Sequence, residues 1–193
     1  MRRGFKSWCE TASRDYRSQL GLGLADRLEP RDLAHHLGVL VLTPQELPGL
    51  SNRAIVQLTK VDPRSWSAAT VAARGRHLVV LNSAHAPTRQ RNSLTHELAH
   101  VVLNHRPANA RVSEEGFLFR DHYDAEQEEE ADWLAGALLL PREGLLSAYR
   151  RTSSSEVIGR IYGVSTKLVD WRLRMTGILT QARRAGRWRK RAS

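Results

Sequence analysis

Apolar residues recur at helical spacing in two long stretches near the middle of the chain. In residues 92–105, Leu94, Leu98 and Val102 fall on one side of a helix, which predicts a helix with one buried face. The second stretch, residues 125–140, is also helical, and Pro141 ends it. Residues 106–124 between them form a long polar connection, and a loop of that length in a compact domain is often functional.

Segments typical of strands precede these helices. They are residues 54–58 (AIVQL), 66–73 (WSAATVAA) and 77–81 (HLVVL), with Gly75 at a turn between the last two. Farther upstream, Pro30 begins a helix that Gly38 ends, and a short strand follows. The pattern predicts an α+β fold, with a small antiparallel sheet packed on a helical core.

The last part of the chain is helical again. Residues 156–162 and 165–174 are separated by Gly163 and by a helix-capping serine, Ser165, which is the pattern of a helix-turn-helix. We therefore divide the chain into a main domain at 1–142, a helix-turn-helix-like segment at 143–182 and a basic tail at 183–193. We expect the tail to be disordered.

Composition narrows the chemistry. The 193 residues are 41% hydrophobic, which is enough for one sizeable core. Cys9 is the only cysteine, so a disulfide framework and a cysteine-based zinc cluster are both excluded. Any metal ion must be bound by histidines and carboxylates.

The charge of the chain is uneven. The net charge is +10, but six basic residues lie within 183–193, and the rest of the chain has 24 basic against 20 acidic residues. The tail therefore predicts, at most, weak non-specific contact with DNA. No apolar run is as long as a membrane span and no signal peptide begins the chain, so we expect a cytoplasmic protein without a membrane partner.

The candidate chemistry lies in the motif H-E-x-x-H. His96 and His100 are one helical turn apart, so both imidazoles can bind one ion. Zinc suits such a site, because it takes tetrahedral nitrogen and oxygen ligands and lowers the pKa of a bound water towards about 7. Glu97 lies beside the pair, where its carboxylate can take a proton from that water.

A third protein ligand is expected from the acidic start of the second helix. With about 100° of rotation per residue, Glu128 and Asp132 fall on one stripe, whereas Glu130 points to another side. The small Ala131 and Ala135 would let this helix approach the first one closely. We expect Glu128 to bind the metal and Asp132 to accept the free ring N–H of a ligand histidine.

Three other residues near the motif have open roles. His105 is expected to help finish its helix. His122 and Tyr123, in the connection over the expected cleft, could polarise a scissile carbonyl or stabilise its oxyanion. A plain surface role is the alternative for both.

These motifs resemble those of the ImmA/IrrE family of metallopeptidases. The resemblance rests on HLVVLN, HELAHVVLNH, the run from Glu128 to Pro141 and the segment GVSTKLVDWRLRMTG. It implies a gluzincin-like site, with His96, His100 and Glu128 as zinc ligands and Glu97 as general base. It also implies a protein substrate, a DNA-binding repressor of the helix-turn-helix type, whose cleavage would relieve repression. Asp132 and Ala99 stand where the family often has Asn and Gly.

A second interpretation is a DNA-binding transcriptional regulator with a vestigial metal site. Its phosphate contacts would come from Arg172, Arg174 and the basic tail. One variant distinguishes the two hypotheses. Glu97→Gln should abolish cleavage if the protein is a peptidase, and should leave DNA binding intact if it is a DNA-binding regulator.

Overall fold

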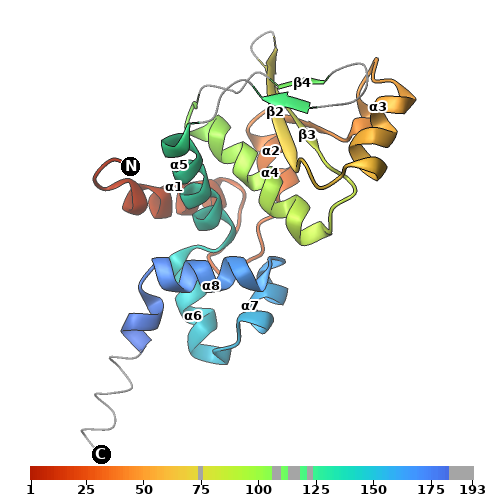
Figure 1. The fold of residues 1–193 in the computed structure, drawn as a ribbon. Coiled ribbons are helices and arrows are strands. Elements are labelled where there is room, and N and C mark those ends of the chain that lie inside the picture. Colours follow the sequence, from red (N-terminus) through yellow and green to blue (C-terminus); the bar gives the residue numbers. More distant parts are fainter. Residues whose placement is uncertain (74–75, 106–109, 113–117, 121–123, 183–193) are drawn as a thin grey trace, which may run out of the picture.

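The computed structural model describes residues 1–73, 76–105, 110–112, 118–120 and 124–182 (Figure 1). Its helices and strands, in chain order, are α1 (Phe5–Gln19), α2 (Pro30–His36), β1 (Leu40–Leu42), the 3-10 turn η1 (Pro44–Glu46), α3 (Asn52–Val56), the π-helical turn η2 (Gln57–Val61), β2 (Ala68–Ala73), β3 (Arg76–Leu81), α4 (Pro87–Val102), β4 (Ala110–Val112), β5 (Leu118–Arg120), α5 (Ala125–Leu139), α6 (Arg142–Thr152), α7 (Ser155–Tyr162) and α8 (Thr166–Met175).

The main sheet has three strands in the order β1-β3-β2. The predicted antiparallel pair is present as β2 and β3, with Ala68 opposite Leu81 and Ala73 opposite Arg76. β1 joins β3 in parallel, so the sheet is mixed rather than wholly antiparallel. A parallel neighbour needs a long crossover, and the chain between β1 and β3 provides one through α3, η2 and β2.

The prediction of a strand at 54–58 was wrong, because these residues lie in α3 and η2. The Ser51 side chain accepts a hydrogen bond from the backbone N–H of Ala54 and so caps the helix. Ala54 and Leu58, one helical turn apart, are both buried, and the Trp66 indole donates to the Leu58 carbonyl. Helical spacing of the buried pair overrides the β-propensity of the segment.

Helix α4 packs against the sheet and carries the H-E-x-x-H motif. Leu94 and Leu98 of α4 belong to the same buried core as Val79 and Leu81 of β3. The helix starts at Pro87, earlier than predicted, because proline is well suited to a first helical position. On the side of α4 away from the sheet lies α5, and α1 packs on α5 in turn (Figure 1).

The connection between α4 and α5 contains regular structure that sequence patterning did not predict. β4 and β5 pair antiparallel, with Ala110 opposite Arg120. Their three-residue length left too little alternation to recognise.

The C-terminal helices form the lower part of the molecule in Figure 1. Gly163 ends α7 with φ +67°, a left-handed conformation that favours glycine, and Ser165 caps α8 by accepting from the Leu168 N–H. α8 packs on α5 through Trp171 and Trp133, whose ring centroids are 5.4 Å apart. The helix-turn-helix-like pair is therefore joined closely to the core.

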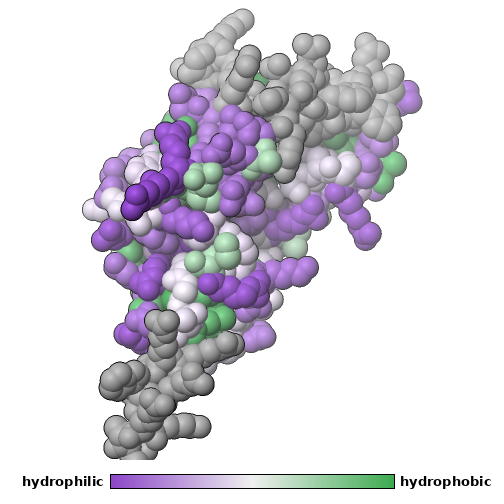
Figure 2. Space-filling model, turned by 60° about the vertical axis from the view of Figure 1, so that its left-hand side comes forward, coloured by the Kyte–Doolittle hydropathy of each residue, from purple (hydrophilic) through white to green (hydrophobic). Residues whose placement is uncertain are grey.

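One face of the molecule is largely polar. Hydrophilic side chains cover most of the face in Figure 2, and apolar residues form small separate groups on it. Within the described ranges, no helix combines the length and the apolar character that crossing a bilayer requires.

Candidate metal centre

Three ligand atoms converge between α4 and α5. The Nε2 atoms of His96 and His100 are 3.0 Å apart. Glu128 places Oε2 at 3.1 Å from the His96 Nε2 and Oε1 at 3.5 Å from the His100 Nε2. Buried Ala131 and Ala135, with no side chain beyond Cβ, permit the close packing of α5 on α4. The structure thus brings together the three residues expected as ligands.

The spacing of these atoms fits a single ion of zinc size. With metal–ligand bonds of about 2.0–2.2 Å in a tetrahedron, neighbouring ligand atoms lie roughly 3.3–3.5 Å apart. The three measured separations, 3.0, 3.1 and 3.5 Å, lie close to that range. Three protein ligands leave a fourth position for water, which is the arrangement of catalytic rather than structural zinc sites.

Asp132 orients the first histidine. Its Oδ1 lies 2.9 Å from the His96 Nδ1, so the ring donates there and turns Nε2 towards Glu128. Burial lowers the pKa of His96, but the hydrogen bonds to Asp132 and Glu128 outweigh it, and the pKa rises to about 9. The metal-free site therefore holds a proton at neutral pH that a metal ion must displace.

His100 differs from His96 in its surroundings. Burial, followed by the positive charge of His96, lowers the pKa of His100 to about 4, so this ring is neutral at pH 7. Its Nδ1 lies 2.9 Å from the Nδ1 of His105, which in turn lies 3.3 Å from Glu130. Sequence reasoning missed the contact between His100 and His105 and the contact between His105 and Glu130. Glu130 lies away from the ligand atoms, as expected, but its carboxylate contacts His105, which in turn contacts His100. The spacing H-x4-H from His100 was the available signal.

Glu97 lies where a general base is expected. It is 7% exposed, and its Oε2 accepts a hydrogen bond of 2.6 Å from the Thr70 hydroxyl of β2. Glu97 and His96 line one cavity of about 540 Å³, together with residues from 64–68 and the start of α4. The role of Thr70 was also missed, because no local pattern links a strand residue to a helix 27 positions away.

His122 and Tyr123, the expected carbonyl-polarising groups, lie outside the described residues. Their roles stay predictions.

Two histidines on one helix and a glutamate on the next define a protein of the H-E-x-x-H class, with a site that could bind one metal ion. The particular family follows from comparison with known proteins. The family model described as the IrrE N-terminal-like domain, Peptidase M78, matches residues 36–174, and the chain belongs to this family. This confirms the resemblance inferred from the motifs.

A solved structure has a similar fold. It is a transcriptional regulator from Mycobacterium tuberculosis, 15% identical in sequence, with a TM-score of 0.51. The alignment covers 89% of this chain but 47% of the regulator, so the chain spans about half of that protein's length. A comparison with curated proteins finds no match to this sequence.

Proposed function

We propose that the protein is a zinc-dependent endopeptidase that cleaves a DNA-binding repressor of the helix-turn-helix type and so relieves repression. The convergence of His96, His100 and Glu128, with Glu97 in the same open cavity, carries the proposal. A site built only to stabilise the fold would be closed by a fourth protein ligand.

The residues have separate roles in peptide hydrolysis. Zinc, when bound by the three ligands, would supply a Lewis acid that activates water and polarises the scissile carbonyl. The Glu97 carboxylate takes the proton of the attacking water and passes it to the leaving amine. The Thr70 hydroxyl donates to one Glu97 oxygen and so fixes the orientation of the carboxylate. Asp132 holds the His96 ring in its ligand tautomer.

The repressor substrate is supported by family membership and by the regulator whose fold is similar. The rival function, direct DNA binding, has less support from the described residues. Arg172, a proposed phosphate contact, is 0% exposed and bonds to Glu10 and to the Leu140 carbonyl, so it cannot reach DNA. Arg174 is exposed, so of these two arginines only this one could contact a phosphate.

The test uses purified protein and the helix-turn-helix repressor encoded beside its gene. Zinc content is measured for the wild type, His96→Ala and Glu97→Gln, and repressor cleavage is followed by mass spectrometry. The wild type should bind one zinc and cleave, Glu97→Gln should bind zinc without cleaving, and His96→Ala should do neither. Cleavage by Glu97→Gln at the wild-type rate would refute the role of the base. DNA binding by the protein itself, equal in the wild type and Glu97→Gln and without any cleavage, would favour the rival function.

A further inference from the structure

Two cavities meet on the exposed side of α4, beside the metal site. The first is the cavity of about 540 Å³ that contains His96 and Glu97. The second, of about 440 Å³, lies between α4, α5 and α8 and includes Asp132, the partner of His96. Arg89 and Asn92 line both cavities, so the two form one groove, with His96 and Glu97 in the wall of the first cavity and Asp132 in the wall of the second.

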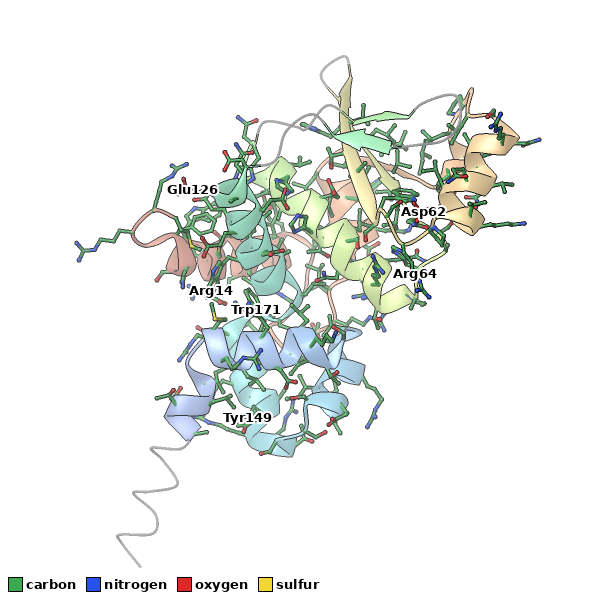
Figure 3. All side chains as sticks on the ribbon, viewed as in Figure 1. Arg14, Asp62, Arg64, Glu126, Tyr149 and Trp171 are labelled. Atoms are coloured by element: carbon green, nitrogen blue, oxygen red, sulfur yellow. The ribbon has the colours of Figure 1, made fainter. Side chains whose placement is uncertain are left out.

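Exposed cations border this groove. They are Arg64 in the first cavity, Lys167 in the second and Arg89 between them. Figure 3 places Arg64 next to the start of α4 and Trp171 at the junction of α5 and α8. Both carboxylates in the cavity linings are already bonded within the protein, Glu97 to Thr70 and Asp132 to His96. The two linings hold three cations against these two carboxylates, so their formal net charge is positive.

The second cavity adds an apolar surface. Ala135, Leu168 and Trp171 line it, and Leu168 and Trp171 are only partly buried. An extended polypeptide that crosses α4 at the metal would place one end near Arg64 and the other on α8. The helix-turn-helix-like segment thus forms a wall of the cleft.

We propose that this groove selects a substrate segment with acidic side chains near the cleaved bond and an apolar side chain that contacts Leu168 and Trp171. The inference rests on the proposed peptidase function. Arg64, Arg89 and Lys167 are specificity-determining residues in this assignment, because each would pair with an acidic side chain in the cleft.

The experiment exposes a proteome-derived peptide library to zinc-loaded protein and counts only cleavages absent with Glu97→Gln. Wild-type sites should be enriched in Asp and Glu within four residues of the cut, by about two- to fivefold for each ion pair. Arg89→Glu should remove this enrichment, whereas Arg53→Glu, exposed on α3 outside both cavities, should retain it.

The outcomes separate the two levels of the proposal. Glu97-dependent cleavage without acidic enrichment, or enrichment unchanged in Arg89→Glu, overturns the groove assignment and leaves the peptidase standing. An absence of any Glu97-dependent cleavage, in protein that binds zinc, overturns the peptidase function and the groove assignment with it.

A second inference rests on a different observation, the buried contacts behind His100. The Nδ1 atoms of His100 and His105 are 2.9 Å apart, and the His105 Nε2 is 3.3 Å from the Glu130 Oε2. The His105 and Glu130 side chains are 8% and 7% exposed, so water does not compete freely for these bonds. Two neutral imidazoles can hydrogen-bond through facing nitrogens only if one donates and the other accepts.

Proton positions follow from the ligand geometry. The His100 Nε2 faces the other ligand atoms and must carry a lone pair to bind a metal, so its proton is on Nδ1 and is donated to His105. His105 then accepts at Nδ1 and carries its own proton on Nε2, which it donates to Glu130. In this arrangement each of the two contacts has one donor and one acceptor.

The backbone holds His105 in place. Asn104 takes a left-handed conformation, φ +52°, directly after α4. The N–H of Asn104 donates to the Val101 carbonyl and that of His105 to the His100 carbonyl, which is a Schellman ending of the helix. This turn brings the His105 ring back against His100 instead of towards solvent.

We infer that His105 and Glu130 are positioning residues that set the ligand tautomer of His100, as Asp132 does for His96. Neither His105 nor Glu130 is itself a metal ligand in this assignment. They raise metal affinity by excluding the tautomer in which the His100 Nε2 carries a proton.

The test measures zinc affinity by competition with a chromophoric chelator, and stability by urea unfolding of the metal-free protein. His105→Leu should bind zinc about 10- to 100-fold more weakly. His105→Gln, whose amide can both accept and donate, should bind within about threefold of the wild type. The double variant His105→Leu/Glu130→Leu removes the buried charge together with its partner, so its metal-free stability should match the wild type while its zinc affinity stays low.

A purely structural role would give other results. Zinc affinity of His105→Leu within about twofold of the wild type would overturn the inference. Recovery of zinc affinity in the double variant, together with its stability, would overturn it as well, since affinity would then follow the fold and not the tautomer.

Discussion

Arg172 joins three helices, and its replacement by Met tests how the C-terminal segment is attached. The guanidinium is fully buried, with Nη2 2.6 Å from the Glu10 carboxylate of α1. Nε and Nη2 also donate to the Leu140 carbonyl at the end of α5, at 3.1 and 2.9 Å. Met keeps the length and apolar stem of the side chain and removes every one of these bonds.

Breaking a buried ion pair by removing one partner costs about 3–5 kcal/mol. Glu10 keeps some solvation, since its side chain is 22% exposed, and it still accepts from the Arg142 N–H at 2.9 Å. We therefore expect the lower end, a loss of about 3 kcal/mol in the free energy of unfolding. With an m-value of about 2 kcal/mol/M, the urea midpoint falls by about 1.5 M.

The assay is urea unfolding followed by circular dichroism, with a chelator in all samples so that metal binding does not change the apparent stability. Arg174→Met, exposed on the same helix, is the control and should change the free energy of unfolding by less than about 0.5 kcal/mol. In a double-mutant cycle, Glu10→Gln should cost less in the Arg172→Met background than alone. A midpoint shift for Arg172→Met as small as that of the control would refute the reasoning.

Three further predictions concern the site and the packing. Zinc affinity should rise about tenfold per pH unit up to about pH 9, because below that pH His96 holds a proton that zinc must displace. Competition titrations from pH 6 to 9 measure this, and an affinity that levels off above pH 7 would contradict it. Thr70→Val should lower kcat/KM on a cleaved peptide by about tenfold with zinc content unchanged, since Glu97 loses the hydroxyl that holds it; equal rates would remove Thr70 from the mechanism. Gly144→Ala, although alanine favours helices, should lower the free energy of unfolding by about 2 kcal/mol in thermal melts, because the new Cβ would lie 2.1 Å from the Leu24 carbonyl oxygen. Ser147→Ala, exposed in the same helix, should leave the melting temperature nearly unchanged.

Local rules account for much of the site. The i, i+4 spacing of His96 and His100 needs only a helix to aim two imidazoles at one point, and helical phase distinguishes Glu128 from its acidic neighbours. The same phase places Asp132 one turn farther along, where it meets the His96 ring. Helix ends followed similar rules, since Pro141 and Gly163 act through their backbone geometry and Ser165 through its side-chain hydroxyl.

Contacts between distant segments needed the tertiary structure. Thr70 meets Glu97 because β2 lies against α4, and His105 meets Glu130 because α5 packs beside the end of α4. Arg172 reads in the sequence as a surface cation, and only the packing of α8 on α5 and α1 buries it. The parallel pairing of β1 and the helix at Asn52–Val56 likewise do not follow from local propensity. The sequence by itself determined the candidate ligands and the family, because both depend on short-range spacing. The supporting hydrogen bonds and the cleft depended on how the helices pack, a property that no local pattern encodes.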